Sequence, residues 1–251
     1  MNILVDKTLI SYARPAVLCG HHASRHDTDV KATFETFDMV NPDIYIADAD
    51  LLNNTVFKNI EERPALKVCV VQKSNRAEHE NRKIFEERFG NIYPWINDTG
   101  YADIFDYKDS QFVEKYKCDL VCIEDNIQAQ LESINLNFSI KFRIFSSNVI
   151  RNNNYCGIVP HNIKKHLYRS SKCSIAVGDN YYNSILCGCY PIDLSKDIIE
   201  QVNTDNSAKL KAQTEELLEK HTNFHATANV FDVLNLTKEA AIIRNKVKEL
   251  I

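Results

Sequence analysis

The stretch from Cys156 to Leu194 limits the possible folds most, because helical and extended patterns alternate in it over short distances. The expected elements, in chain order, are a helix after Pro160, a strand over 173–177 that ends at Gly178, a short helix over 183–188 and a strand over 190–194. Helices and strands that alternate in this way form an α/β unit with a parallel sheet. Ligands of such sheets bind at the carboxyl ends of the strands.

The charge of this region is opposite to that of the whole chain. The sequence has a formal net charge of -4, yet no Asp or Glu occurs between Ser133 and Gly178. The basic residues of this window are Lys141, Arg143, Arg151, Lys164, Lys165, Arg169 and Lys172. A positive field beside helix N-termini suits a phosphorylated ligand. The alternative interpretation is a solvated helix face with chance clustering of charge.

Three short motifs carry a resemblance to a known family. They are the G-x-V-P step at 157–160, the strand end at Gly178-Asp179, and the turn over 187–192. With the order of elements, they resemble the donor-binding half of a GT-B glycosyltransferase. More narrowly, Gly157 to Asn183 is similar, without gaps, to bacteriophage glucosyltransferases that modify hydroxymethylcytosine in DNA. This similarity covers about a tenth of the chain, and the order of elements extends it more loosely over most of the rest.

The resemblance implies an α/β fold of the GT-B type, with two facing Rossmann-like domains and a crevice between them. The expected domains are an acceptor-side domain over 1–130, a nucleotide-sugar-binding domain over 131–236, and a C-terminal helix over 237–251 that crosses back to the first domain. The donor-binding residues that it implies are Ser147, Arg151, Arg169, Gly178, Asp179, Asn180, Asn183 and Ser184. GT-B enzymes commonly carry a glutamate for the donor ribose at the position of Asn183, where an amide can also bond a hydroxyl.

Candidate catalytic residues come from the first half of the chain. A strand expected over 43–47 runs into Asp48 and Asp50, and Asp48 is the candidate base for an acceptor hydroxyl. The dense polar loop 21–27 offers His22 and His26 as further bases. The alternatives are that Asp50 or Asn53 caps the next helix, and that the histidines belong to a solvated loop. Other strands are expected over 1–6, 65–71, 119–123 and 141–145.

Residues that flank the expected crevice would contact nucleic acid if the acceptor is DNA. They are Arg25, Lys73, Arg76, Lys164 and Lys165. The overall acidity of the chain argues mildly against DNA, because contacts to phosphates need a basic surface. The basic window can serve the donor alone.

The eight cysteines are scattered through apolar segments. Neither Cys187-x-Cys189 nor the Cys118 and Cys122 pair has a second pair at metal-binding spacing, so no metal site is expected. Without a secretion signal, a reducing cytoplasm is the expected compartment, the host's if the protein is viral. No apolar run is long enough to span a bilayer, so no membrane partner is expected, and the chain is expected to be a monomer.

These observations lead to a metal-independent glycosyltransferase that requires no cofactor. It would move a sugar from a nucleotide donor, UDP-sugar as co-substrate, to an acceptor hydroxyl. The acceptor suggested by the resemblance is 5-hydroxymethylcytosine in double-stranded DNA, which would be flipped out of the stack. A saccharide or lipid-linked acceptor is the alternative within the same class. A non-catalytic nucleotide- or nucleic-acid-binding α/β protein is the alternative outside it.

Overall fold

The computed structural model describes residues 1–27, 33–73, 80–89, 93–125, 134 and 140–250. It is an α/β protein with parallel sheets, which confirms the α/β part of the expected fold class. It divides into two units. Unit 1 comprises Met1–Thr99 and Asn223–Ile251, and unit 2 comprises Gly100–Thr222. Among the described residues, no helix is long and apolar enough to cross a membrane.

Unit 1 is built on a parallel sheet of strand order β2-β1-β3-β4-β5. Its strands are β1 (Asn2–Asp6), β2 (His22–His26), β3 (Ile44–Asp48), β4 (Lys67–Lys73) and β5 (Trp95–Asp98). The expected strands over 1–6, 43–47 and 65–71 are therefore confirmed within two residues. The loop expected over 21–27 is wrong, because β2 pairs with β1 from Asn2↔His22 to Asp6↔His26. Polar composition hid this edge strand, since tertiary pairing overrides local strand preference.

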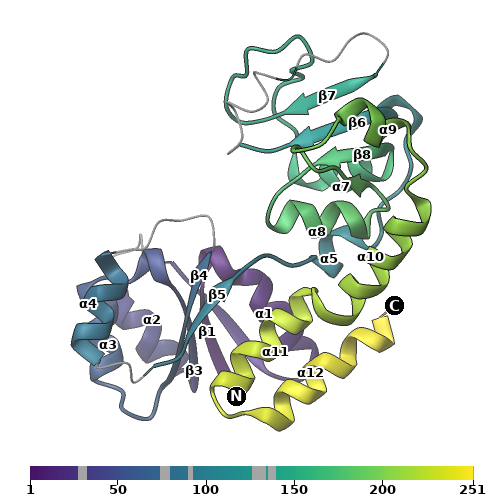
Figure 1. Ribbon diagram of the computed structural model, residues 1–251. Helices are drawn as coiled ribbons and strands as arrows, with labels where there is room; N and C mark the ends of the chain where they lie inside the picture. The colour runs from purple at the N-terminus through teal and green to yellow at the C-terminus, as the bar shows by residue number, and fades with distance from the viewer. Residues whose placement is uncertain (28–32, 74–79, 90–92, 126–133, 135–139, 251) are drawn as a thin grey trace. The chain divides into compact units, whose positions relative to one another are not determined.

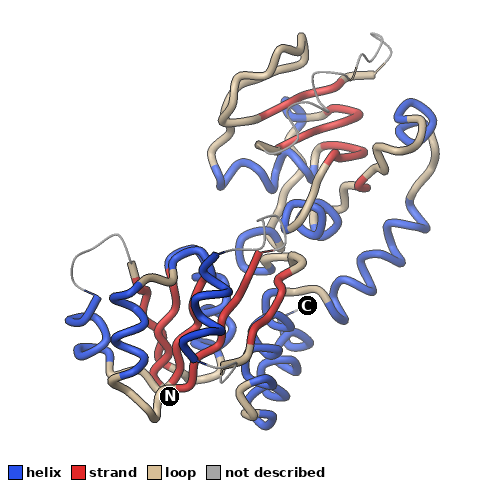
Figure 2. The backbone as a smooth tube through the Cα atoms, turned by 60° about the vertical axis from the view of Figure 1, so that its left-hand side comes forward, coloured by secondary structure: helices blue, strands red, loops and turns tan. Residues whose placement is uncertain are grey.

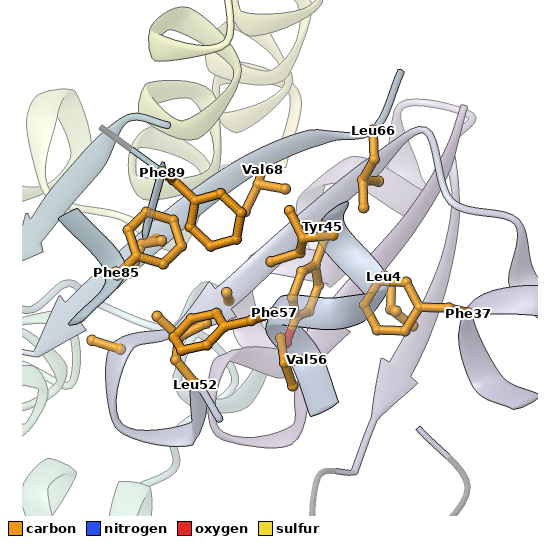
Figure 3. Close-up of a cluster of buried hydrophobic side chains, with 14 residues drawn as sticks. Leu4, Phe37, Tyr45, Leu52, Val56, Phe57, Leu66, Val68, Phe85 and Phe89 are labelled. Carbon is orange, nitrogen blue, oxygen red and sulfur yellow. The ribbon is translucent and has the colours of Figure 1, made fainter. Parts of the chain in front are cut away.

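Helices cover both faces of this sheet, as Figure 1 shows. Its helices are α1 (Ile10–Leu18), α2 (Thr33–Val40), α3 (Asn54–Glu61), α4 (Glu80–Phe89), α11 (Asn223–Val233) and α12 (Thr237–Leu250), with short 3₁₀ turns at Lys7–Leu9 and Ala49–Leu51. The face under α2, α3 and α4 holds a buried cluster that includes Leu4, Phe37, Tyr45, Phe57 and Phe85 (Figure 3). The apolar strands fit between two helical layers, as expected for parallel sheets covered on both sides.

Unit 2 contains a smaller parallel sheet of strand order β7-β6-β8-β9. Its elements are β6 (Cys118–Ile123), β7 (Phe142–Phe145), β8 (Ser171–Ile175), β9 (Tyr190–Pro191), α5 (Ile104–Tyr107), α7 (His161–Arg169), α8 (Asp179–Leu186), α9 (Ile198–Asn203) and α10 (Ser207–Lys220), with a 3₁₀ turn at Glu114–Tyr116. Leu120 and Cys122 face one buried cluster, and Val121 and Ile123 face the other. This alternation follows from the two-residue period of a strand.

The boundary between the units differs from the expected one near residue 130. β6 pairs with β7 and β8, so it belongs to the second sheet, although the sequence placed it in the first domain. The last helix, α12, belongs to unit 1, and α11 belongs there with it. A strand can pair with the sheet that follows it as readily as with the one before, and its own sequence does not distinguish the two.

The first four strands of each sheet follow the same spatial order, in which the second strand is followed by the first, the third and the fourth. Figure 2 shows the strands of each sheet in red. In each unit the first strand, β1 or β6, lies between the second and the third. The chain therefore changes its direction of travel across the sheet at β1/β3 in unit 1 and at β6/β8 in unit 2. Ligands of open parallel sheets bind at such points, outside the carboxyl ends of the strands.

Candidate functional site

Three polar side chains, those of Asp6, His26 and Tyr45, meet the backbone of Asp48 at the carboxyl edge of the unit 1 sheet. The Asp6 carboxylate lies 2.8 Å from His26 Nδ1 and accepts hydrogen bonds from the Tyr45 hydroxyl at 2.9 Å and the Asp48 N–H at 2.7 Å. The pairing of Asp6 with His26 in the β1–β2 register explains why the first two meet. The structure thus brings together two predicted residues, Asp48 and His26, through Asp6 and Tyr45, which the sequence analysis did not single out.

This cluster is buried. Asp6, His26 and Tyr45 are fully buried, and Asp48 is 1% exposed. Burial raises the pKa of Asp6 above its ordinary value, although hydrogen bonds from His26 and Asp48 act in the opposite direction. Among the described residues, His26 Nε2 has no hydrogen-bond partner, and the edge of the imidazole packs against Phe37.

Asp48 has a structural role beside any chemical one. Its carboxylate accepts hydrogen bonds from the Thr8 hydroxyl at 2.5 Å and from the Asp50 N–H at 3.0 Å, and it caps the 3₁₀ turn that follows β3. Of the alternatives considered for the next helix, Asn53 is the cap of α3, since its side chain accepts from the N–H groups of Thr55 and Val56.

The remaining candidates of the first half lie elsewhere. His22 is at the amino end of β2, opposite Asn2 in register, so it does not share an edge with Asp48. Arg25 is exposed on β2, next to Val5 of β1. Lys73 ends β4, and its side chain lies outside the described residues, as does the whole of Arg76.

A second polar cluster lies at the carboxyl edge of the unit 2 sheet. Asp125 follows β6, and its Oδ1 atom accepts hydrogen bonds from the Ser146 hydroxyl at 2.9 Å and the Ser147 N–H at 2.6 Å. Partial burial raises the pKa of Asp125, but these bonds and the charge of Lys164 outweigh it, so the pKa lies below its ordinary value. The basic window contains no acid in the sequence, but in the folded structure Asp125 lies against its residues Ser146 and Ser147.

Glu124 is the buried carboxyl group at the β6/β8 switch point. Its Oε1 atom accepts a hydrogen bond from the Val177 N–H at 2.8 Å, and the residue is 6% exposed. Burial raises the pKa of Glu124 to about 7, against weaker opposing effects of the Val177 bond, Asn180 and Lys164. A carboxyl group that titrates near neutral pH in such a place is a candidate for function. In the sequence, Glu124 directly follows the strand expected over 119–123.

The predicted donor residues of α8 bond within the protein. Asp179 accepts from the Tyr101 N–H at 3.1 Å and Asn183 from the Asp103 N–H at 2.8 Å. The Asn180 amide donates to the Ile123 carbonyl at 3.0 Å, and the Ser184 hydroxyl donates to the Tyr181 carbonyl at 2.8 Å.

The bonds of Asp179 and Asn183 hold α8 to the segment that enters unit 2. Gly100 makes the contact possible, because a Cβ atom there would lie 2.8 Å from the Gly178 carbonyl carbon. Asn183, the residue expected to bind the ribose, is only 5% exposed, and its side chain bonds the Asp103 N–H instead.

Arg169 lies at the wrong edge for a donor contact with Gly178. It ends α7, and β8 begins two residues later, so Arg169 is at the amino end of the sheet while Gly178 follows the carboxyl end of β8. A helix that connects parallel strands must return to the amino edge. Of the other predicted residues, Lys164 is in the first turns of α7, Lys165 pairs with Asp109 at 2.5 Å, and Arg151 is exposed in the loop after β7.

The comparisons add no family. The sequence matches neither a model of a known protein family nor a curated protein. Within the described ranges, no group of three or more His, Cys, Asp or Glu side chains is placed to hold a metal ion. The two carboxyl-edge clusters are therefore the candidate site residues on geometry alone.

Proposed function

We propose that the protein is a glycosyltransferase that uses a nucleotide-sugar donor, UDP-sugar in the first instance. The diphosphate would bind at the carboxyl edge of unit 2, against Ser146, Ser147 and Lys164. The acceptor hydroxyl would lose its proton to the cluster of Asp48 and His26 in unit 1. The proposal includes the GT-B arrangement and requires no metal or other cofactor.

The observation that carries this proposal is the pair of donors that converge on Asp125. The Ser146 hydroxyl and the Ser147 N–H both bond one anionic oxygen, and Lys164 lies close enough to lower the pKa of that carboxyl. Donors that are already arranged around a carboxylate oxygen also suit a phosphate oxygen, because both are charged acceptors. Preorganised donors of this kind stabilise the charge that develops on a leaving diphosphate.

Uridine diphosphate at millimolar concentration is expected to raise the Tm of the protein, since a ligand that binds the folded state stabilises it by mass action. Lys164→Ala should weaken binding about tenfold, because it removes a charged contact to the diphosphate. Asp125→Asn should strengthen binding, because its carboxylate competes for the same donors. Thermal-shift titrations with each variant measure these changes.

Lys220→Ala is the matched control for this test. It removes a basic side chain of unit 2 that pairs with Glu216 on α10, so the uridine diphosphate shift should not change. The proposed donor site is wrong if no nucleoside diphosphate shifts the Tm, or if Lys220→Ala and Lys164→Ala weaken binding equally.

The acceptor is tested with duplex DNA that contains 5-hydroxymethylcytosine and with matched unmodified DNA. Transfer should occur only on the modified duplex, because cytosine offers no hydroxyl, whereas the hydroxymethyl group becomes a nucleophile once its proton is removed. Mass spectrometry of the nucleosides after incubation with UDP-hexose and UDP-pentose donors measures the gain. No gain with any donor, together with donor hydrolysis, would exclude DNA and leave saccharide or lipid-linked acceptors.

A non-catalytic nucleotide-binding protein is the second candidate, and one observation favours it. Asp48 and His26 are buried beneath Thr8 and Phe37, respectively, rather than presented on the surface. Donor hydrolysis separates the two functions, because a transferase slowly hydrolyses its donor without acceptor and a binding protein does not. Binding of uridine diphosphate without hydrolysis of any UDP-sugar would favour this second function.

A further inference from the structure

A hollow of about 390 Å³ lies at the amino edge of the unit 2 sheet, at the opposite end of the strands from Glu124. Four cationic side chains and one acidic side chain line it. The lining residues are Phe112, Lys117, Cys118, Asp119, Lys141, Arg169, Ser170, Ser171 and Lys172. The proposed transfer reaction uses none of them. A hollow with this excess of positive charge suits an anionic ligand.

The acidic groups nearby leave much of this charge uncompensated. Asp119 pairs with Lys172 at 2.7 Å, and Glu114 pairs with Lys117 at 3.5 Å. Lys141 is exposed, and its ammonium group has no ion-pair partner among the described residues. Arg169 donates one hydrogen bond, from Nη1 to the Cys187 carbonyl at 3.3 Å. Its guanidinium keeps further N–H donors for a ligand.

The absence of a Cβ atom at Gly188 leaves room for this arginine. A Cβ atom on Gly188 would be 2.7 Å from Arg169 Nη1, and the backbone there has a φ of +80°, which favours glycine. The arginine therefore crosses over the glycine rather than extending freely from the end of α7. Such a fixed guanidinium is better suited to phosphate recognition than a mobile one.

Two further features indicate what kind of anion fits. Phe112, 55% exposed, places an aromatic ring among the cations of the hollow. A second hollow, of about 400 Å³, shares Lys172 with the first and is lined by hydrogen-bonding side chains that include Asn203, Thr204 and Ser207. Its one carboxylate, that of Asp205, accepts a hydrogen bond from the Ser207 N–H at 3.0 Å. Aromatic rings interleaved with basic residues are typical of surfaces that bind single-stranded nucleic acid.

We propose that this amino edge of unit 2 binds a single strand of nucleic acid. Lys141, Arg169 and Lys172 contact its phosphates, and Phe112 stacks on one base. The next nucleotide occupies the second hollow, where amide and hydroxyl groups bond it. Two adjoining hollows that share one lysine favour a strand over a single nucleotide. The proposal does not depend on glycosyl transfer, since it uses the opposite edge of the sheet.

The test is fluorescence anisotropy of a labelled single-stranded oligothymidylate with the 251-residue protein. Affinity should fall steeply with salt, and Lys141→Ala should reduce the slope of log K against log salt by about 1. Phe112→Ala should weaken binding by about tenfold through lost stacking. Lys220→Ala, at the far end of α10 and paired with Glu216, is the matched control and should leave binding unchanged.

Three outcomes would overturn the proposal. One is no binding of the strand at low salt by protein whose melting curve shows it to be folded. The second is binding of uridine monophosphate as tight as that of the strand, which would make the hollow a mononucleotide site. The third is equal competition by heparin with no effect of Phe112→Ala, which would reduce the edge to a general polyanion surface.

Discussion

Asp6→Ala is expected to destabilise the protein by about 3–5 kcal/mol, because it leaves several buried hydrogen-bond donors without their acceptor, at about 1–3 kcal/mol each. The Asp6 carboxylate bonds His26, Tyr45 and the Asp48 N–H, and none of these groups is exposed by more than 1%. Alanine leaves all of them without their acceptor and out of reach of water. Urea unfolding, followed by circular dichroism, measures the loss.

Asp43→Ala is the control for this prediction. The carboxylate of Asp43, also in unit 1, accepts a hydrogen bond from the Asn2 N–H at 2.7 Å. Unlike Asp6, Asp43 is exposed. Its removal should cost about 1 kcal/mol, because water can replace the lost acceptor. Equal losses for Asp6→Ala and Asp43→Ala would show that the buried cluster does not hold the edge together. Asp6→Asn should fall between them, because an amide keeps one oxygen acceptor.

Much of the fold follows from local sequence. The apolar runs over 43–47, 65–71 and 119–123 become β3, β4 and β6, since strands buried between helical layers must be apolar throughout. The failures have tertiary causes. β2 is polar because it lies at an edge of its sheet. β6 was assigned to the wrong domain because the sequence of a strand does not reveal which strands it pairs with.

The site was less predictable than the fold. Asp48 was found from its place after a strand-like run and His26 from the dense polar loop expected over 21–27, but Asp6 was noted only as the end of a strand. The register that sets Asp6 against His26 is a property of the sheet and not of either segment. Arg169 is a different kind of error. A helix between parallel strands returns to the amino edge, so the expected topology already placed its last residue away from Gly178.

The carboxyl group of Glu124 makes the stability of unit 2 depend on pH. Burial raises its pKa to about 7, from 4.5 in the unfolded chain. For an acid whose folded pKa is raised, the folded state holds the proton more tightly than the unfolded state between these two values. The free energy of unfolding is therefore highest below pH 4.5, falls as pH rises, and is lowest above pH 7.

Glu124→Gln should remove this dependence, because glutamine keeps the shape and an oxygen for the Val177 N–H but cannot ionise. At pH 8 the variant is expected to be more stable than the wild type by up to about 3 kcal/mol, the equivalent of the pKa shift. At pH 4 the two proteins should be equally stable. Chemical unfolding at a series of pH values between 4 and 8 gives both curves.

Glu114→Gln is the control, since Glu114 is an exposed carboxylate of the same unit that pairs only with Lys117 among the described residues. A surface pair of this kind contributes about 0–1 kcal/mol, so its pH profile should follow that of the wild type. If Glu124→Gln has the same stability as the wild type at pH 8, the carboxyl group is already solvated in the folded protein. A further outcome is that Glu124→Gln is more stable than the wild type while uridine diphosphate no longer raises its Tm. That result would show that the buried carboxylate of Glu124 lowers stability but is needed for ligand binding, a common trade-off at functional sites.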